Sequence, residues 1–299
     1  MVFKLHNLKF DNFGHSYDVV RSAMIELGHT EGEDADINFF NHIHTFEDKC
    51  IIVKPTAPTA KHFALDPHGY ANTSEIAYED PYIYETMYSH LNPKNDMDWG
   101  IITDLIEKKS NKWDDSILLK WRKEKQPIPD DHILVIGQMA DDETVNGFGF
   151  GDHWKRLCMI VEYLKKIHGF DIVVKLHPSM KLRGKQKDIV DGWIQYDRIT
   201  VIDGYISIHD ILPKTHVAIV DNSTAGIECL MHEVPVISHG WPEYHWVTAK
   251  LQTLPHLETL IRDIRWHDKD RARQFIYWYI NDYLCTDIDS TINRLKQLI

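Results

Sequence analysis

Short apolar runs recur along the chain, and stretches with apolar residues at every third or fourth position separate them. Such runs are typical of buried parallel strands, whereas the wider spacing predicts amphipathic helices. The runs lie at 2–10, 50–53, 133–136, 171–176, 199–202, 217–220 and 234–237. Strands that alternate with helices predict an α/β fold with a parallel sheet in each half of the chain.

The predicted helices differ in how clearly their ends are marked. In the first of them, Ser16 is a candidate N-cap and Gly28 is a candidate C-terminal stop. Residues 61–100 are rich in tyrosine and predict an irregular segment. Further helices are expected at about 101–124 and 152–168, from Ala225, and over 270–299.

One segment, 123–131, interrupts the alternation of strands and helices. It is charged, contains two prolines and precedes a new series of strands and helices, so it is the best candidate for a linker. The length of 299 residues also exceeds that of one average domain. We therefore expect an N-terminal domain over 1–128, a second domain over 129–270 and a C-terminal helix over 271–299.

Composition and charge disfavour several classes of protein. No apolar run approaches the roughly 20 residues that span a bilayer, and the N-terminus lacks the features of a secretory signal. The four cysteines are scattered, as in a reduced, cytoplasmic protein, and the histidines lack the spacing of a metal site. A net charge of −12 opposes extensive binding to nucleic acid. We expect a cytoplasmic protein without metal or stable membrane insertion.

Polar residues follow the predicted strands of the second domain at the points where these strands end. Ligands of parallel α/β sheets bind at this edge. Cations and hydroxyls near a helix N-terminus suit phosphate, and carboxylates suit sugar hydroxyls or proton transfer. The pattern predicts a nucleotide-bearing substrate. The residues are Gln138, Asp141 and Asp142 after the first strand, Lys175 and His177 at the second, Ser223 and Thr224 after the fourth, and Glu228 in the next helix.

Most of these residues also have a structural interpretation. Asp141 and Asp142 could cap a helix or occupy a turn, and Ser223 and Thr224 could be simple N-caps. Glu228 could form an ion pair on a helix surface. His177 could be an incidental residue at a strand end, because histidine is frequent in this chain.

The order of four motifs resembles one known family. Ile-Gly-Gln-x-x-Asp-Asp, Lys-Leu-His-Pro, Asn-Ser-Thr-Ala-Gly-Ile-Glu-Cys-Leu and Gly-x-Pro-x-Tyr follow one another over about residues 133–250. They are similar to the motifs of bacterial capsule polysaccharide glycosyltransferases, and most of all to those of β-Kdo transferases. The resemblance implies a GT-B fold, which has two Rossmann-like domains and a C-terminal helix that crosses back to the first.

The resemblance also implies roles for individual residues. Gln138, Asp141 and Asp142 match the element that supplies a catalytic carboxylate. Lys175 and His177 match the element that lines the nucleotide-sugar site. Ser223 and Glu228 match the pair that contacts the donor nucleotide, with Thr224 beside them. In GT-B enzymes the first β/α loop often brings an acceptor-side group to the active site, which makes His15 a third catalytic candidate or else a structural loop histidine.

The sequence therefore predicts a glycosyltransferase that uses a nucleotide-sugar and no further cofactor. Gly240-Trp-Pro-Glu-Tyr-His-Trp departs from the family pattern and leaves the donor open between a CMP-Kdo type and a UDP-sugar. The expected acceptor is a bacterial glycan. The alternatives are a phage-type DNA glycosyltransferase acting on a hydroxymethylated base, a nucleotide-sugar epimerase, and a non-catalytic sugar-binding scaffold.

Overall fold

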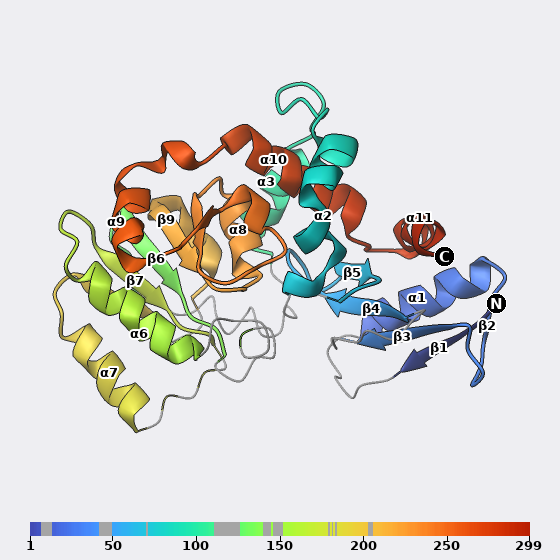
Figure 1. The fold of residues 1–299 in the computed structure, drawn as a ribbon, viewed down its shortest axis with the longest axis horizontal. Helices are drawn as coiled ribbons and strands as arrows, with labels where there is room; N and C mark the ends of the chain where they lie inside the picture. The colour runs from blue at the N-terminus through green and yellow to red at the C-terminus, as the bar shows by residue number, and fades with distance from the viewer. Residues whose placement is uncertain are drawn as a thin grey trace. The chain divides into compact units, whose positions relative to one another are not determined.

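The structure is a computed structural model, and the chain divides into two compact units. One unit contains residues 1–114 and 274–299, and the other contains residues 115–273. Each unit has its own β-sheet (Figure 1). The structure describes residues 1–6, 14–41, 50–69, 71–110, 126–139, 145, 152–178, 180, 182, 184–202 and 206–299, except the side chains of 72 and 79–82.

The first unit contains a five-stranded sheet in the order β2-β1-β3-β4-β5. The first four strands of this order are parallel, and β5 runs antiparallel to β4. The central strand β3 was not predicted, because it lies in a span that appeared polar. Its alternating side chains are buried and half-buried in turn. The strands are β1 (Val2–His6), β2 (Thr30–Glu31), β3 (Ile37–Asn41), β4 (Cys50–Pro55) and β5 (Phe63–Asp66).

Helix α1 (Gly14–Glu26) buries Val20 and Met24 in the core of this unit. The prediction that Ser16 caps this helix is wrong, since the helix begins two residues earlier and the serine is buried within it. Gly28 has a φ of +82°, and its N–H donates to the carbonyl oxygen of Ile25. A left-handed residue at this position is the usual helix stop, as the sequence predicted.

The prediction of an irregular segment over 61–100 is wrong. The segment holds β5, the 3₁₀ turn Ala71–Thr73, helix α2 (Glu75–Ile83) and a π-helical turn, Tyr84–Tyr88. Tyr88 is fully buried and stacks on Trp278 with ring centroids 5.3 Å apart, so this tyrosine is part of the core, whereas Tyr78 is 65% exposed. The next helix, α3 (Gly100–Glu107), is shorter than the predicted 101–124; residues 111–125 lie outside the described part of the chain.

The C-terminal residues form two helices instead of one. Helix α10 (Lys269–Trp278) continues into a π-helical turn, Tyr279–Tyr283, and α11 (Ile288–Leu298) follows after a break. At the break the backbone of Cys285 pairs with that of Phe63 in β5, in an isolated antiparallel β-bridge with two N–H···O hydrogen bonds. Helix α11 lies beside α1 and buries Leu295 in the same core (Figure 1).

Two polar contacts also hold the C-terminal segment in the first unit. The Tyr283 hydroxyl donates to Asp66 at 2.8 Å. The same carboxylate accepts backbone N–H groups of His68, Gly69 and Glu75, which organise the turn after β5. The guanidinium of Arg294 donates to the carboxylate of Glu75 at 2.6 Å.

The second unit contains a six-stranded parallel sheet in the order β11-β10-β9-β6-β7-β8. The central strands are buried on both faces, which explains their uninterrupted apolar runs. Every strand predicted for this half is present. The strands are β6 (His132–Ile136), β7 (Ile172–Lys175), β8 (Ile199–Ile202), β9 (Thr215–Val220), β10 (Val236–Ser238) and β11 (Ala249–Lys250).

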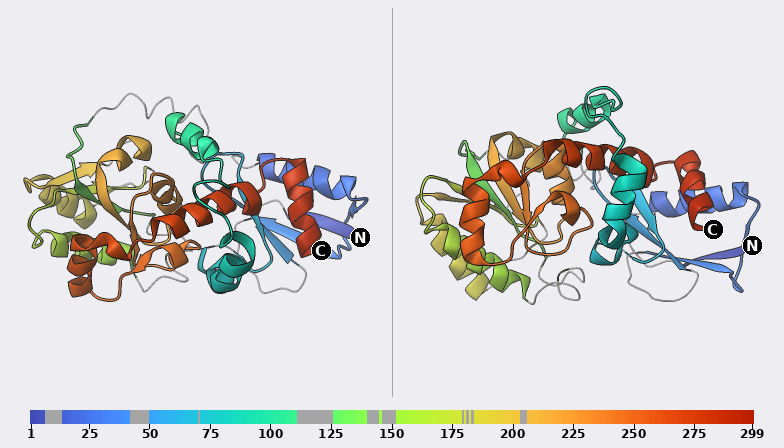
Figure 2. Two further views of the ribbon diagram at one scale, coloured as in Figure 1. Left: turned by 90° about the horizontal axis from the view of Figure 1, so that it is seen from above. Right: turned by 45° about the horizontal axis from the view of Figure 1, so that its top comes forward.

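Helices α6 (His153–Leu164), α7 (Lys185–Ile194) and α9 (Leu254–Arg262) share one hydrophobic core with the sheet. Figure 2 shows α6 and α7 side by side over one face. Helix α8 (Ala225–Met231) packs instead against β9, β10 and the 3₁₀ turn Ile208–Asp210. Three further 3₁₀ turns are described in this unit, Leu212–Lys214, His245–Val247 and Ile264–Trp266.

The strand order reverses between β6 and β9, because β7 and β8 extend the sheet on one side and β10 and β11 on the other. Neighbouring connections leave such a switch point in opposite directions, and a ligand-binding crevice forms there at the carboxyl ends of the strands. The two sheets and their helices confirm the predicted α/β, Rossmann-like organisation. In the described parts of the chain, no helix combines the length and apolar character needed to cross a bilayer.

Candidate functional site

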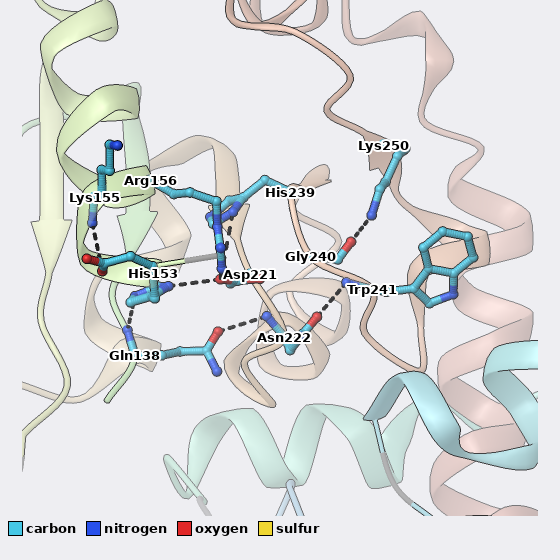
Figure 3. A network of polar contacts seen from close by, with 11 residues as sticks. Gln138, His153, Lys155, Arg156, Asp221, Asn222, His239, Gly240, Trp241 and Lys250 are labelled. Carbon is cyan, nitrogen blue, oxygen red and sulfur yellow. Dashed lines mark hydrogen bonds and ion pairs between the residues drawn. The ribbon is translucent and has the colours of Figure 1, made fainter. Parts of the chain in front are cut away.

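The carboxyl ends of β6 and β9 are joined by a hydrogen bond at the switch point (Figure 3). Gln138 follows β6 and is buried, and its side-chain oxygen accepts the backbone N–H of Asn222, which follows β9, at 2.8 Å. The backbone N–H of Gln138 donates to Nε2 of His153 at 2.9 Å. One glutamine thus connects the loops after two strands and the start of α6.

His153 continues this network to a buried carboxylate. Since Nε2 accepts a backbone N–H, the proton of the neutral ring lies on Nδ1, which donates to Oδ2 of Asp221 at 2.9 Å. The Arg156 guanidinium, one turn further along α6, donates to the same carboxylate oxygen. Both His153 and Asp221 are fully buried.

Opposing effects set the pKa of Asp221. Burial raises the pKa of this carboxyl, but hydrogen bonds from His153 and Arg156 and the charge of Arg156 outweigh burial and hold the pKa at about 2. His239 contributes to this only in acid, where its own ring is protonated. The carboxylate is therefore ionised at neutral pH. His239 lies near it, with Nδ1 3.9 Å from Oδ2, and burial lowers the pKa of this imidazole to about 4. The cluster carries an ionised Asp221, a charged Arg156 and a neutral His239.

The loop after β10 packs directly on these groups. A β-carbon at Gly240 would lie 2.1 Å from Oδ1 of Asp221 and 2.3 Å from Oδ1 of Asn222, so only glycine fits. Asn222 accepts the backbone N–H of Trp241. Lys250 donates to the Gly240 carbonyl oxygen and lies 4.8 Å from the centre of the Trp241 ring, which remains 40% exposed.

A second close contact joins the same loop to α8. The hydroxyl of Tyr244, a fully buried residue, donates to the carbonyl oxygen of Ser223. The Ser223 hydroxyl accepts the N–H of Ala225 and so caps the first turn of α8, while Thr224 makes no side-chain cap. Ser223 and Thr224 are both half-buried. The family-like motifs at 222–230 and 240–244 are therefore packed against each other.

Lys175 and Glu228 form the charged part of this edge. Lys175 is the last residue of β7 and is half-buried, whereas Glu228 lies in α8 and is buried. Burial lowers the pKa of Lys175 to about 8, and the negative charge of Glu228 opposes this shift. The ammonium group is thus charged at neutral pH but close to its titration. His177, two residues beyond, is half-buried.

The structure brings several of the predicted residues to one edge of the second unit. Gln138 and Ser223 lie in the switch-point network, and Lys175 interacts with Glu228. His15 belongs to the first unit, and the prediction that it lies in a loop is wrong. It is an exposed residue of the first turn of α1, with Nε2 3.2 Å from the carbonyl oxygen of Thr286. Its catalytic role stays a prediction.

The two predicted catalytic carboxylates, Asp141 and Asp142, lie outside the described residues. Their catalytic role stays a prediction. In the described ranges, no group of three or more histidine, cysteine, aspartate and glutamate side chains is arranged to hold a metal ion.

Sequence reasoning missed the buried cluster of His153, Arg156, Asp221 and His239. Asp221 directly follows the predicted strand 217–220, but only the hydroxyl residues Ser223 and Thr224 of this loop were predicted as site residues. His153 and Arg156 have the i, i+3 spacing that places two side chains on one helix face, which was an available signal. Nothing in the local sequence of His239 distinguishes it from the other histidines.

Two Rossmann-like units, with a switch-point site in the second, define the GT-B fold. Two solved structures share this fold at low sequence identity. The β-Kdo 2,4 transferase of KpsC from Thermosulfurimonas dismutans superposes with a TM-score of 0.55 and 15% identity, over 98% of this chain and 97% of that one. The β-Kdo 2,7 transferase of the same protein gives 0.52 and 14%, over 99% of both chains. A UDP-GlcNAc 2-epimerase from Methanocaldococcus jannaschii gives 0.43 and 10%, over 99% and 98%.

The sequence itself settles the family. A model of the family described as capsule polysaccharide biosynthesis protein matches residues 44–276, which is well over half of the chain. The chain belongs to this family, and the resemblance seen in its motifs is confirmed. No curated protein sequence matches the chain.

Proposed function

We propose that this protein is a glycosyltransferase of capsule polysaccharide biosynthesis that moves a sugar from a nucleotide-sugar to a hydroxyl of a bacterial glycan. The observation that carries the proposal is the switch-point network, in which Gln138 fixes the loop that leads from β9 into α8. Glu228 lies in α8, and its charge acts on Lys175 at the end of β7. Ligands of doubly wound sheets bind at this place. Membership of the capsule family supports a glycan as the acceptor.

In the proposed donor complex, Lys175 and Glu228 have complementary roles. The Lys175 ammonium would stabilise the negative charge that develops on the departing phosphate, where a fixed cation in a partly dry site is most effective. The buried Glu228 carboxylate would accept hydrogen bonds from ribose hydroxyls. Ser223, Thr224 and His177 would line the same site. The donor is either of the CMP-Kdo type or a UDP-sugar.

Transfer also requires a group that takes the proton of the acceptor hydroxyl. Asp141 and Asp142 lie three and four residues after Gln138 in the sequence, and they are our first candidates for this base. His15 is the second candidate, and its ring is exposed. That the reaction needs no metal or further cofactor stays a prediction, which transfer in the presence of EDTA tests.

The donor half is tested by a thermal-shift series with UDP, CMP, GDP and their sugar conjugates. A ligand at about 100 times its Kd stabilises the folded state by roughly 2.7 kcal/mol, which raises Tm by a few degrees. We expect one nucleotide to stabilise the wild-type chain and to fail with Lys175→Met. Lys185→Met, an exposed change at the start of α7, is the matched control. No shift with any nucleotide would contradict the proposal and favour a non-catalytic scaffold.

The transfer half is tested with the donor found in this series. Incubation with capsule oligosaccharide should give an elongated product, and Asp142→Asn should abolish it without changing Tm. Conversion of the donor without an acceptor would instead reveal an epimerase. Transfer to hydroxymethylated DNA, with a steep dependence on salt, would reveal a DNA-modifying enzyme.

A further inference from the structure

A pocket of about 470 Å³ opens on the side of the second unit that carries α6 and α9. One wall is formed by Arg156, Met159 and Ile160 of α6, and the other by residues 250–254. His239 lies between them. Pockets of this volume hold ligands of the size of a nucleotide or a short amphiphile. Ser223 and Glu228, by contrast, belong to the segment that forms α8, which packs outside the α6–α9 core.

His239 has an unusual position in this pocket. Its side chain is only 6% exposed, and within the described part of the structure neither ring nitrogen has a hydrogen-bond partner. Nδ1 lies 3.9 Å from Oδ2 of Asp221, which is beyond hydrogen-bonding distance. A buried polar group without a partner is unfavourable by about 1–3 kcal/mol. Both ring nitrogens are shielded from solvent, so a ligand satisfies them only if the imidazole turns toward the pocket.

The other lining residues indicate the chemistry of that ligand. Arg156 and Lys250 bring two positive charges, against the single buried carboxylate of Asp221, so the polar end of the pocket favours an anion. Met159, Ile160, Leu251 and Leu254 give the rest of the wall an apolar surface. A phosphate group alone would leave this apolar surface uncovered, whereas an apolar body attached to it would bury the surface.

We propose that this pocket binds a small phosphate monoester with an apolar body, whose phosphate lies beside Arg156 and Lys250 and accepts a hydrogen bond from the His239 ring once that ring turns toward it. The apolar body lies along Met159 and Leu254 toward the mouth. This ligand is additional to the proposed sugar donor. Because Lys250 also holds the Gly240 carbonyl oxygen, an occupant that contacts Lys250 is linked to the loop that carries Trp241.

Isothermal titration of the whole chain tests the pocket with two probes, geranyl phosphate and inorganic phosphate. They share the phosphate and differ in whether an apolar body is attached to it. Met159→Trp should fill the mouth, and because Met159 is 48% exposed the change leaves the core intact. Lys155→Trp, an exposed site on the same helix outside the pocket lining, is the matched control.

We expect geranyl phosphate to bind more tightly than inorganic phosphate, to lose affinity by about tenfold or more in Met159→Trp, and to keep it in Lys155→Trp. His239→Leu should lose a similar factor, since it removes the donor without adding bulk. Equal affinity for the two probes would contradict the apolar body. Absence of binding, or equal affinity in wild type, Met159→Trp and His239→Leu, would overturn the proposal. A probe whose affinity falls only in Lys175→Met is bound at the donor site and also speaks against the pocket.

Discussion

Tyr244 occupies the space that a side chain at Gly226 would need. A β-carbon at position 226 would lie 2.1 Å from the Tyr244 hydroxyl oxygen and 2.3 Å from the ring carbon that bears it. The same hydroxyl donates to the carbonyl oxygen of Ser223. The tyrosine therefore fixes the start of α8 in two ways, by a hydrogen bond and by packing its ring against Gly226.

Gly226→Ala should destabilise the second unit by about 2–3 kcal/mol, because the new β-carbon would overlap the fully buried ring of Tyr244. The measurement is the midpoint of chemical unfolding. Gly192→Ala is the matched control, because a β-carbon at this position in α7 meets no atom within 4 Å and alanine favours a helix. Equal midpoints for the two variants would contradict this prediction and show that the Tyr244 ring moves aside at little cost in stability.

Donor affinity should fall as pH rises from 7 to 9. Burial lowers the pKa of Lys175 to about 8, so the ammonium is charged below this pH and loses its charge above it. An anionic donor is held by the charged form. Lys175→Arg should flatten the decrease, since a guanidinium stays charged throughout. The measurement is the dissociation constant of the stabilising nucleotide at each pH. The same pH dependence in wild type and in Lys175→Arg would contradict the assignment of this dependence to Lys175.

His239 should make the second unit less stable in mild acid. Burial lowers the pKa of His239 in the folded state to about 4 from 6.5, so between these values the unfolded chain binds the extra proton. The stability present above pH 6.5 is lost as pH falls toward 4, and the loss amounts to about 2 kcal/mol at pH 5. His239→Gln should remove this part of the dependence. The unfolding free energies at pH 7 and pH 5 would then differ less than in wild type.

Trp241 should contribute to substrate binding without contributing to stability. Its ring is 40% exposed, is held by Lys250 on one side and lies 4.9 Å from His245, so an aromatic surface is presented beside the switch point. Trp241→Ala should raise the acceptor KM about tenfold with little change in kcat or Tm. Trp241→Phe keeps a flat ring and should retain most of the affinity. A large fall in Tm would show a structural role instead.

Leu295→Ala should destabilise the first unit by about 2–5 kcal/mol, because this side chain of α11 is fully buried against α1. Lys296→Ala, exposed on the same helix, is the control and should be near neutral. Amide hydrogen exchange of β1 and β3 is the measurement. Unchanged exchange in the leucine variant would mean that α11 adds little to this core.

The second unit could be predicted from sequence because its strands are buried on both faces and its helices are short and well marked. The first unit was harder. Its strand Ile37–Asn41 alternates between buried and half-buried residues, and asparagines at both inner and outer positions hide the alternation. The tyrosines after residue 70 were taken for an irregular segment, although Tyr88 has its packing partner, Trp278, far away in sequence. Long-range contacts of this kind leave no local pattern.

The candidate site was predicted in the same uneven way. Strand ends placed Gln138 and Lys175 at the correct edge, because that edge is fixed by the direction of a parallel sheet. The partners of Asp221 were not predictable, since its neighbours come from α6 and from the end of β10. The close approach of Gly240 to Asp221 depends on backbone positions that the sequence does not encode locally.

The tautomer of His153 has a consequence for how such clusters are recognised. A histidine that donates to a buried aspartate is the arrangement that activates a nucleophile in many hydrolases. In this protein the remaining ring nitrogen already accepts the backbone N–H of Gln138, so no lone pair is left to take a proton from water. A search for catalytic dyads by distance alone would select this pair, yet its geometry makes it a structural clamp between two loops and not a general base.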